Sequence, residues 1–193
     1  MVDLWAGFGA FIIGFLALGL RVITLAFEPN QEARDALRLS FPDVILLDSL
    51  DQFKGDMVSQ LVKKKELTGI IVNGGCVKQG LPAVTASQKA ADKRRPAQWV
   101  RRISSSIRAV CSVPVVECLE NSGSVSGQTR DFTSQCLTAT PCFINASTFG
   151  WIDRPRIFWI TVNGVNFDWS TCVLPPDLKW APGVDGGGGT ISD

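Results

Sequence analysis

The residues of this chain that could perform chemistry stand mainly where short apolar runs end. The stretch VNGGCVKQGLP (residues 72–82) places Cys76 and Lys78 directly after an apolar run and two glycines. Glu120 closes a second apolar run, VPVVECLEN (residues 113–121). A cysteine thiolate is a nucleophile, and a carboxyl group in a partly desolvated cleft can be held protonated, ready to donate to a ring nitrogen. These residues therefore indicate covalent or acid–base chemistry.

Gly7 and Gly9 follow an apolar start, and glycines there let the backbone of a strand-to-helix turn approach a ligand closely. The full G-x-G-x-x-G fingerprint fails, because Ile12 occupies its last position. Glu28 ends the next strand pattern, where an acid accepts hydrogen bonds from ribose hydroxyls. Asp48 ends the third strand pattern, and its carboxylate could accept a hydrogen bond from an adenine amino group. These residues indicate a nucleoside-containing cofactor, either a dinucleotide or S-adenosylmethionine; a tight turn with exposed carboxylates is the alternative.

Two arginines, Arg154 and Arg156, stand at the start of a further strand pattern, in the sequence DRPRIFWI. Guanidinium groups form paired hydrogen bonds with phosphates and with base carbonyls. The pair could therefore contact a phosphate or a nucleic-acid base. An ordinary charged turn is the alternative interpretation.

The composition limits the classes of function. The chain has 193 residues, enough for one domain with a sizeable core, and 46% of them are hydrophobic. Its 19 basic and 18 acidic residues give a net charge of +1, so no overall field favours a nucleic-acid or membrane partner. The chain has no histidine, and its six cysteines form no Cys-x-x-Cys pair, so no metal site is expected. The same scattered thiols favour a reducing, intracellular environment.

The uncharged run over residues 4–20 could form a signal-sequence core or a short membrane span. However, Asp3 precedes it, where a signal peptide carries lysine or arginine, and the run contains four glycines. We therefore expect no membrane partner, and a membrane anchor stays as an alternative hypothesis.

Apolar strand patterns alternate with helical patterns through most of the chain. Loops are expected over residues 84–98 and 123–128, and Gly19 is expected to end the first helix. The expected strands are 2–5, 21–27, 44–47, 67–73, 113–119, 142–146 and 157–162, and the expected helices are 11–20, 31–41, 56–65 and 99–110.

This alternation predicts a doubly wound, mostly parallel, Rossmann-like α/β sheet. Such a sheet binds ligands beyond the carboxyl ends of its strands, so the candidate residues are expected to share one edge. Residues 1–162 are expected to form this domain. Residues 163–193, which end in WAPGVDGGGGTISD, are expected to form an irregular tail.

Several of these segments resemble, in order, the motifs of the DNA cytosine-5 methyltransferases, over about residues 2–162. VDLWAGFGA resembles their Asp-Leu-Phe-Ala-Gly-x-Gly-Gly opening, and Glu120-Asn121 resembles their Glu-Asn-Val. The other matching segments are Glu28-Pro29-Asn30, the phrase from Ala33 to Val44, Asp48, Gly74-Gly75 with Gln79-Gly80-Leu81, and the Arg-x-Arg strand in FGWIDRPRIFWI. One motif alone would be weak, but the ordered set is specific.

The resemblance implies a Rossmann-like sheet of the S-adenosylmethionine-dependent methyltransferase type, acting on a cytosine flipped out of DNA. In that family a cysteine thiolate attacks carbon 6 of cytosine, and carbon 5 then accepts the methyl group. By motif position, Glu120 would assist at ring nitrogen 3, and Arg156, supported by Arg154, would contact the base. The residues that would line the cofactor are Trp5, Gly7, Gly9, Glu28 and Asp48.

The chain departs from the family at the nucleophile. The flanking motif residues place Lys78 at the cysteine position, and a lysine amine is mostly protonated at neutral pH. Cys76 stands two residues away, about 6–7 Å along an extended chain, so it could act only if the loop refolded. Ser122 replaces the valine of Glu-Asn-Val, and only some thirty irregular residues follow the Arg-x-Arg strand, without a target-recognition region.

Two hypotheses follow from the resemblance. The first is a divergent, truncated DNA cytosine-5 methyltransferase homologue with impaired activity, with Cys76 as the candidate replacement nucleophile. The second is a pseudoenzyme that binds cofactor or nucleic acid and regulates an active partner. In either case a second chain could supply the missing regions. The location implied is intracellular, and nuclear if the source is a eukaryote.

Overall fold

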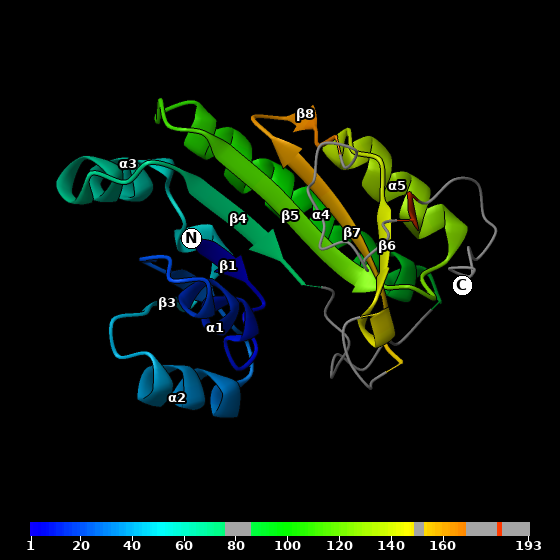
Figure 1. Ribbon diagram of the computed structural model, residues 1–193, viewed down its shortest axis with the longest axis horizontal. Helices are drawn as coiled ribbons and strands as arrows, with labels where there is room; N and C mark the ends of the chain where they lie inside the picture. The colour runs from blue at the N-terminus through cyan, green and yellow to red at the C-terminus, as the bar shows by residue number, and fades with distance from the viewer. Residues whose placement is uncertain (76–85, 149–152, 169–180, 183–193) are drawn as a thin grey trace.

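The computed structural model of the protein describes residues 1–75, 86–148, 153–168 and 181–182. Their strands form one sheet in the order β3-β2-β1-β4-β5-β7-β6-β9, with β8 paired to β7 (Figure 1). The strands are β1 (Val2–Leu4), β2 (Leu25–Phe27), β3 (Ile45–Leu47), β4 (Ile70–Gly74), β5 (Val115–Ser122), β6 (Cys142–Asn145), β7 (Pro155–Val162), β8 (Val165–Asn166) and β9 (Ala181–Pro182).

The strands from β3 to β5 are parallel to their neighbours. The chain winds from β1 outward to β2 and β3 and then returns to β4 on the other side of β1. A doubly wound sheet has its ligand-binding crevice where the winding reverses in this way. β7 runs antiparallel to both β5 and β6. The predicted mostly parallel, Rossmann-like sheet is therefore confirmed, with an antiparallel β7 that the sequence patterns did not indicate.

Helices cover both faces of the sheet (Figure 1). α3, α4 and α5 pack on one face, and α1 and α2 pack on the other. In chain order the helices are α1 (Ala10–Ala17), α2 (Gln31–Ser40), the short 3-10 helix η1 (Leu50–Gln52), α3 (Gly55–Lys65), α4 (Ala86–Arg108), α5 (Gly127–Leu137) and the 3-10 helix η2 (Ala146–Thr148).

The side chains of the sheet divide into two cores. Val2 and Leu4 belong to the larger core, together with Trp159 of β7 and apolar residues of α3, α4 and α5. The smaller core includes Ile12 of α1 and Leu37 of α2. Complete burial of an apolar side chain of this size stabilises a fold by about 1.5–3 kcal/mol. The larger core therefore holds β1, β4, β5 and β7 in a fixed arrangement, and these strands carry most of the candidate site.

The start of α4 corrects one prediction. The sequence predicts a loop over residues 84–98, but α4 begins at Ala86. Its first residues are mostly alanine, lysine, arginine and glutamine, all strong helix formers, and apart from Pro96 the sequence of this helix has no apolar residue larger than alanine before Trp99. Helix propensity rather than an apolar pattern therefore accounts for this part of the helix.

α5 corrects a second prediction, because it begins inside the loop expected over residues 123–128. Ser126 caps the helix, and its Oγ accepts a hydrogen bond from the amide of Thr129. The buried side of α5 consists of Thr129, Thr133 and Leu137. Two of these three are threonines, so the apolar periodicity that indicates a helix is weak.

α1 ends at Ala17, earlier than residue 20, where the predicted helix ends. Gly19 terminates it as expected, with a φ angle of 73°. The amides of Gly19 and Leu20 donate back to the carbonyls of Leu16 and Phe15, at 2.9 and 3.1 Å. This pair of hydrogen bonds is the Schellman motif that commonly ends a helix at glycine.

The apolar run over residues 4–20 is divided between the end of β1, a turn and α1. Among the described helices, none combines the length and the apolar composition that a membrane crossing requires.

Gly9 allows α1 to approach α2. Its φ angle is 85°, and a Cβ atom there would lie 2.6 Å from Cε2 of Phe41 and 3.0 Å from Cδ2 of Leu37. We therefore expect Gly9→Ala to lower the free energy of unfolding by about 1–3 kcal/mol, through backbone strain and overpacking. Gly14→Ala is the control, because a Cβ atom at Gly14 would have no neighbour within 4 Å.

Alanine within a helix is expected to stabilise by about 0.5–1 kcal/mol relative to glycine, so G14A should unfold at the same or a higher urea concentration than the wild type. Urea unfolding of the three proteins makes the comparison. A G9A protein as stable as the wild type would contradict the close packing of α1 on α2.

Candidate functional site at the carboxyl edge of the sheet

Glu28 follows β2 directly and is almost fully buried. Its Oε2 accepts a hydrogen bond from the amide of Gly7, and its Oε1 accepts one from the amide of Asn30, both at 2.8 Å. The amide of Gly9 donates to the carbonyl of Ala6. The two glycine amides expected to face a ligand are therefore engaged within the protein. Each Glu28 oxygen can still accept a further hydrogen bond, because a carboxylate offers about four lone-pair sites.

Trp5 follows β1 in a conformation that is rare for a large side chain, with a φ angle of 61°. Its amide and that of Ala6 both donate to the carbonyl of Phe27, at 2.7 and 3.1 Å. Its ring meets the Phe27 ring edge-on, with the centroids 6.1 Å apart. Backbone strain of this kind costs on the order of 1–3 kcal/mol and is found mainly at functional sites. The structure thus holds Trp5 at the end of β1 at some cost in stability.

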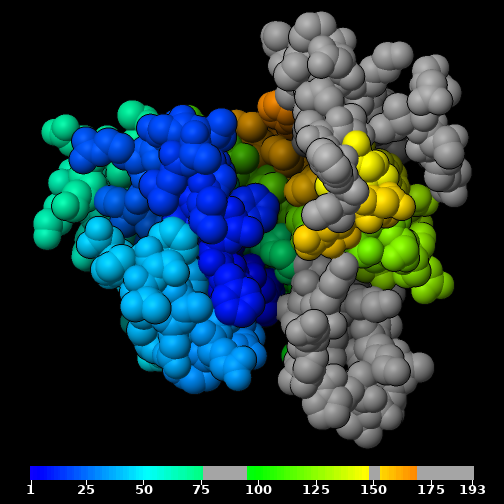
Figure 2. Space-filling model, turned by 60° about the horizontal axis from the view of Figure 1, so that its bottom comes forward, coloured from blue at the N-terminus to red at the C-terminus, as the bar shows by residue number. Residues whose placement is uncertain are grey.

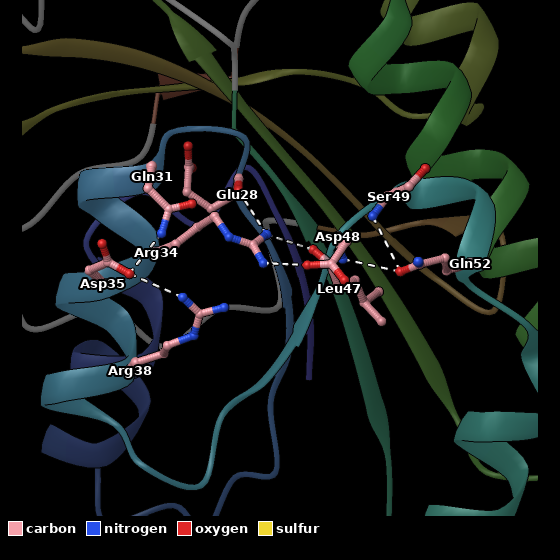
Figure 3. A network of polar contacts seen from close by, with 9 residues as sticks. All are labelled: Glu28, Gln31, Arg34, Asp35, Arg38, Leu47, Asp48, Ser49 and Gln52. Carbon is pink, nitrogen blue, oxygen red and sulfur yellow. Dashed lines mark hydrogen bonds and ion pairs between the residues drawn. The ribbon is translucent and has the colours of Figure 1, made fainter.

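Asp48 is bound by Arg34, a buried cation that the sequence analysis did not single out (Figure 3). From α2, the Arg34 guanidinium donates to the carbonyls of Glu28 and Leu47, at 3.3 and 2.9 Å, and to Oδ1 of Asp48 at 2.6 Å. It therefore ties the ends of β2 and β3 together. The Asp48 side chain is 75% exposed, which leaves its second oxygen accessible to a ligand. The available signal for Arg34 was its position one helical turn before Leu37, on the apolar side of α2.

Gly75 lies between Trp5 and Glu120. A Cβ atom at Gly75 would lie 3.9 Å from the carbonyl oxygen of Trp5 and 4.0 Å from Oε2 of Glu120. The absence of a side chain at this position leaves space between the two residues. A ligand can therefore approach the backbone here more closely than at any residue with a Cβ atom.

Glu120 and Arg156, taken from two separate motifs of the sequence, form an ion pair between β5 and β7. Nη1 of Arg156 also donates to the carbonyl of Pro155 at 2.8 Å. The two side chains are only 21% and 14% exposed, so solvent screens this pair less than a surface pair. Arg154 is exposed, and its amide donates to Oδ1 of Asn145 at 2.9 Å. The structure thus brings Arg156, rather than Arg154, to the Glu120 carboxylate.

Cys118 precedes Glu120 by two residues in β5. Burial, followed by the negative charges of Glu120 and Asp3, raises the pKa of the Cys118 thiol to about 12. This thiol therefore stays protonated and is unsuited to act as a nucleophile. Cys76 and Lys78 lie outside the described residues, so their roles remain predictions. Within the described ranges, no group of three or more histidine, cysteine, aspartate and glutamate residues could hold a metal ion.

The carboxyl edge of the sheet unites the central candidates. Glu28, Trp5, Gly75 and Glu120 each come one residue after the last register pair that joins β2, β1, β4 and β5. In Figure 2, which brings this side of the molecule forward, the N-terminal residues (blue to teal) lie on one side and β6 and β7 (yellow to orange) on the other. Asp48 is connected to this group through Arg34. The candidate residues therefore lie at the edge where a doubly wound sheet binds its ligands.

No protein-family model matches the sequence, and no curated protein matches it. Among solved structures, the fold is similar to that of a DNA modification methyltransferase encoded within an E. coli prophage, with a TM-score of 0.57 and 18% identity, over 82% of this chain and 45% of that chain. It is similar to the Dnmt2 methyltransferase of S. pombe, with a TM-score of 0.57 and 12% identity, over 87% of this chain and 50% of that one.

A third similar structure is the Entamoeba histolytica methyltransferase EhMeth, with a TM-score of 0.53 and 12% identity, over 82% of this chain and 51% of that chain. The chain therefore spans about half the length of these proteins. At these identities the likeness concerns the fold. The resemblance to methyltransferases noted in the sequence is confirmed at that level.

Arg34 provides a direct test of how the Asp48 side of the site is built. Replacement by methionine keeps an unbranched stem in place of the arginine methylenes but removes the guanidinium, and so leaves the carbonyls of Glu28 and Leu47 without this donor. We expect Arg34→Met to lower the free energy of unfolding by about 1–3 kcal/mol. The control is Arg38→Met on the same helix, which removes an exposed ion pair with Asp35 of 3.0 Å and should cost about 0.5 kcal/mol or less. Equal effects of the two substitutions on urea unfolding would contradict the structural role of Arg34.

Proposed function

We propose that this protein is a divergent homologue of the DNA cytosine-5 methyltransferases and that it binds S-adenosylmethionine at the carboxyl edge of β1, β2, β4 and β5. The observation that carries the proposal is the convergence of Trp5, Glu28, Gly75 and Glu120 at this one edge. These four residues come from four separate motifs of the sequence. They follow β1, β2, β4 and β5, which are neighbours in the sheet. The three similar solved structures named above are described as methyltransferases, which supports the same class.

The residues present fit this cofactor. S-adenosylmethionine supplies a methyl group bound to a positively charged sulfur. Glu28 retains an acceptor site on each oxygen beyond its bonds to Gly7 and Asn30, which suits the two ribose hydroxyls. The exposed second oxygen of Asp48 can accept from the adenine amino group. Trp5 offers an apolar ring, and the absent side chain of Gly75 gives room for a ligand beside it.

In the proposed role, Glu120 and Arg156 receive a flipped cytosine. Arg156 orients the Glu120 carboxylate through their ion pair, so that Glu120 can assist at ring nitrogen 3 of the base. The guanidinium of Arg156 is then placed to contact the carbonyl oxygen of the base, and Arg154 supports it from the same strand. DNA is the proposed nucleic-acid partner.

The nucleophile position sets the expected level of activity. The sequence places Lys78 where the family has its cysteine, and a protonated amine cannot attack carbon 6 of cytosine. We therefore expect little or no methyl transfer by this chain alone. The same substitution favours the second candidate function, a pseudoenzyme that binds cofactor or nucleic acid and acts through a partner.

Isothermal titration calorimetry with S-adenosylmethionine tests the cofactor site. Because Glu28 would accept charge-assisted hydrogen bonds from the ribose, Glu28→Gln should weaken binding about 10- to 100-fold. Glu32→Gln is the matched control, since Glu32 is an exposed acid in the first turn of α2 and should leave affinity unchanged. No binding heat from folded wild-type protein would refute the proposed cofactor.

DNA that contains 5-fluorocytosine tests the nucleophile, because an attacking thiolate remains covalently attached to this base after methyl transfer. We expect no covalent adduct with the wild-type protein in the presence of S-adenosylmethionine, and the same result with Cys76→Ser. Denaturing electrophoresis followed by peptide mass spectrometry detects and maps any adduct. An adduct at Cys76 that C76S abolishes would show that the loop does bring this thiol to the base, and the pseudoenzyme alternative would then be wrong.

A further inference from the structure

Beneath the candidate site, Asp3 of β1 and Asn73 of β4 form a polar pair inside the sheet. They are register partners in adjacent parallel strands, and each residue is only 1% exposed. Nδ2 of Asn73 donates to Oδ1 of Asp3 at 2.7 Å. The other two oxygens of the pair, Oδ2 of Asp3 and Oδ1 of Asn73, are buried and have no hydrogen-bond partner. The pair thus has two unsatisfied acceptors and needs one more donor.

An ionised Asp3 cannot supply that donor, because a carboxylate only accepts hydrogen bonds. A single proton taken from solvent onto Oδ2 changes the pair. The new O–H can donate to Oδ1 of Asn73, while Nδ2 of Asn73 continues to donate to Oδ1 of Asp3. A carboxylic acid and a primary amide then form a closed ring with two hydrogen bonds, and both unsatisfied oxygens gain a partner. Unpaired buried polar atoms are costly, so the protonated form is favoured.

We propose that Asp3 is a protonated carboxylic acid in the folded protein at mildly acidic pH, and that its doubly hydrogen-bonded pair with Asn73 positions the ends of β1 and β4 at the candidate site. Trp5 and Gly75 come two residues after Asp3 and Asn73 and directly follow β1 and β4. Asp3 is therefore a positioning residue rather than a catalytic one. The proton assignment is independent of the proposed function, whereas any effect on S-adenosylmethionine binding depends on it.

The charges around Asp3 support this assignment. Burial raises the pKa of Asp3 to about 6, and the negative charge of Glu28 adds to the effect, against the hydrogen bond from Asn73 and the N-terminal ammonium group, which both lower it. The N-terminal amine titrates in the same range, because burial lowers its pKa to about 6. On the β5 side, the register partner of Asn73 is Cys118, which is uncharged because its pKa is about 12. On the β2 side the register partner of Asp3 is Ala26, and α1 (AFIIGFLA) has no titratable side chain.

The sign of the pH dependence follows from the raised pKa. The folded state binds the Asp3 proton more tightly than the unfolded state, whose carboxyl has the ordinary value of 3.8. The stability that this proton contributes is complete below that value and is lost as the pH rises through about 6. Above that pH, Asp3 carries a buried negative charge close to the acidic residues of the candidate site. The Asp3–Asn73 pair then keeps only one hydrogen bond. We therefore expect the ends of β1 and β4 to loosen as Asp3 ionises.

The first test measures the proton directly. In wild-type protein labelled with 13C at aspartate, the Cγ resonance of Asp3 should titrate with a midpoint near 6, and the amide resonances of Trp5 and Gly75 should shift with the same midpoint. A midpoint near the ordinary value of 3.8 would overturn the proposal. Asp3 titration without any response at Trp5 and Gly75 would overturn the positioning role.

The second test uses Asp3→Asn, which mimics the protonated acid because the new amide can donate where the O–H would. Urea midpoints of D3N and the wild type should be close near pH 4, and D3N should become the more stable as the pH rises to 8, where the wild type has lost the proton. The amide shifts of Trp5 and Gly75 should no longer titrate near 6 in D3N. Asp43→Asn, at an exposed position, is the control and should keep the wild-type pH profile. A D3N protein that is less stable than the wild type by the same amount at both pH values would contradict the acid–amide ring.

Discussion

The Glu28 carboxylate accepts hydrogen bonds from the amides of Gly7 and Asn30, and through them it joins the turn after β1 to the turn after β2. Asn30 in turn caps α2 by accepting from the amide of Ala33 at 2.9 Å. The close approach of α1 to α2 at Gly9 depends on this junction, because both helices leave the sheet from these two turns. One nearly buried carboxylate therefore fixes the geometry of the edge and still has acceptor capacity for a ligand.

The acidic side chains near the sheet are stabilised by different kinds of partner, and how deeply each is buried differs. Glu28 is bound by backbone amides, and the exposed Asp48 and the partly exposed Glu120 are each paired with an arginine. Glu117, on the opposite face of β5, is fully buried and is paired with Arg108 at 2.6 Å. A buried carboxylate needs such compensation, because burial without it is strongly unfavourable. Asp3 instead faces the side-chain amide of Asn73. In the proposed pair, a bound proton removes the charge that would otherwise need compensation.

Local patterns in the sequence were sufficient for much of the fold. They predicted the central strands, the parallel arrangement and the edge on which Glu28 and Glu120 lie, because apolar runs and strand ends are local features. They missed the role of Arg34, whose acceptors include a carbonyl on β3, and of Asp3, whose partner is on β4. Such contacts join segments distant in the sequence. The patterns also missed the start of α4 and all of α5, where propensity and capping outweigh apolar periodicity.

The central claim is that the carboxyl edge of β1, β2, β4 and β5 binds S-adenosylmethionine. Amide chemical-shift mapping during titration with S-adenosylmethionine tests it residue by residue. The account predicts shifts concentrated at residues 5–9, 28–30, 48–49, 75 and 120–122, with α3 and α5 unaffected. Saturable shifts confined to other surfaces, or no shifts from a well-folded sample at millimolar cofactor, would contradict it.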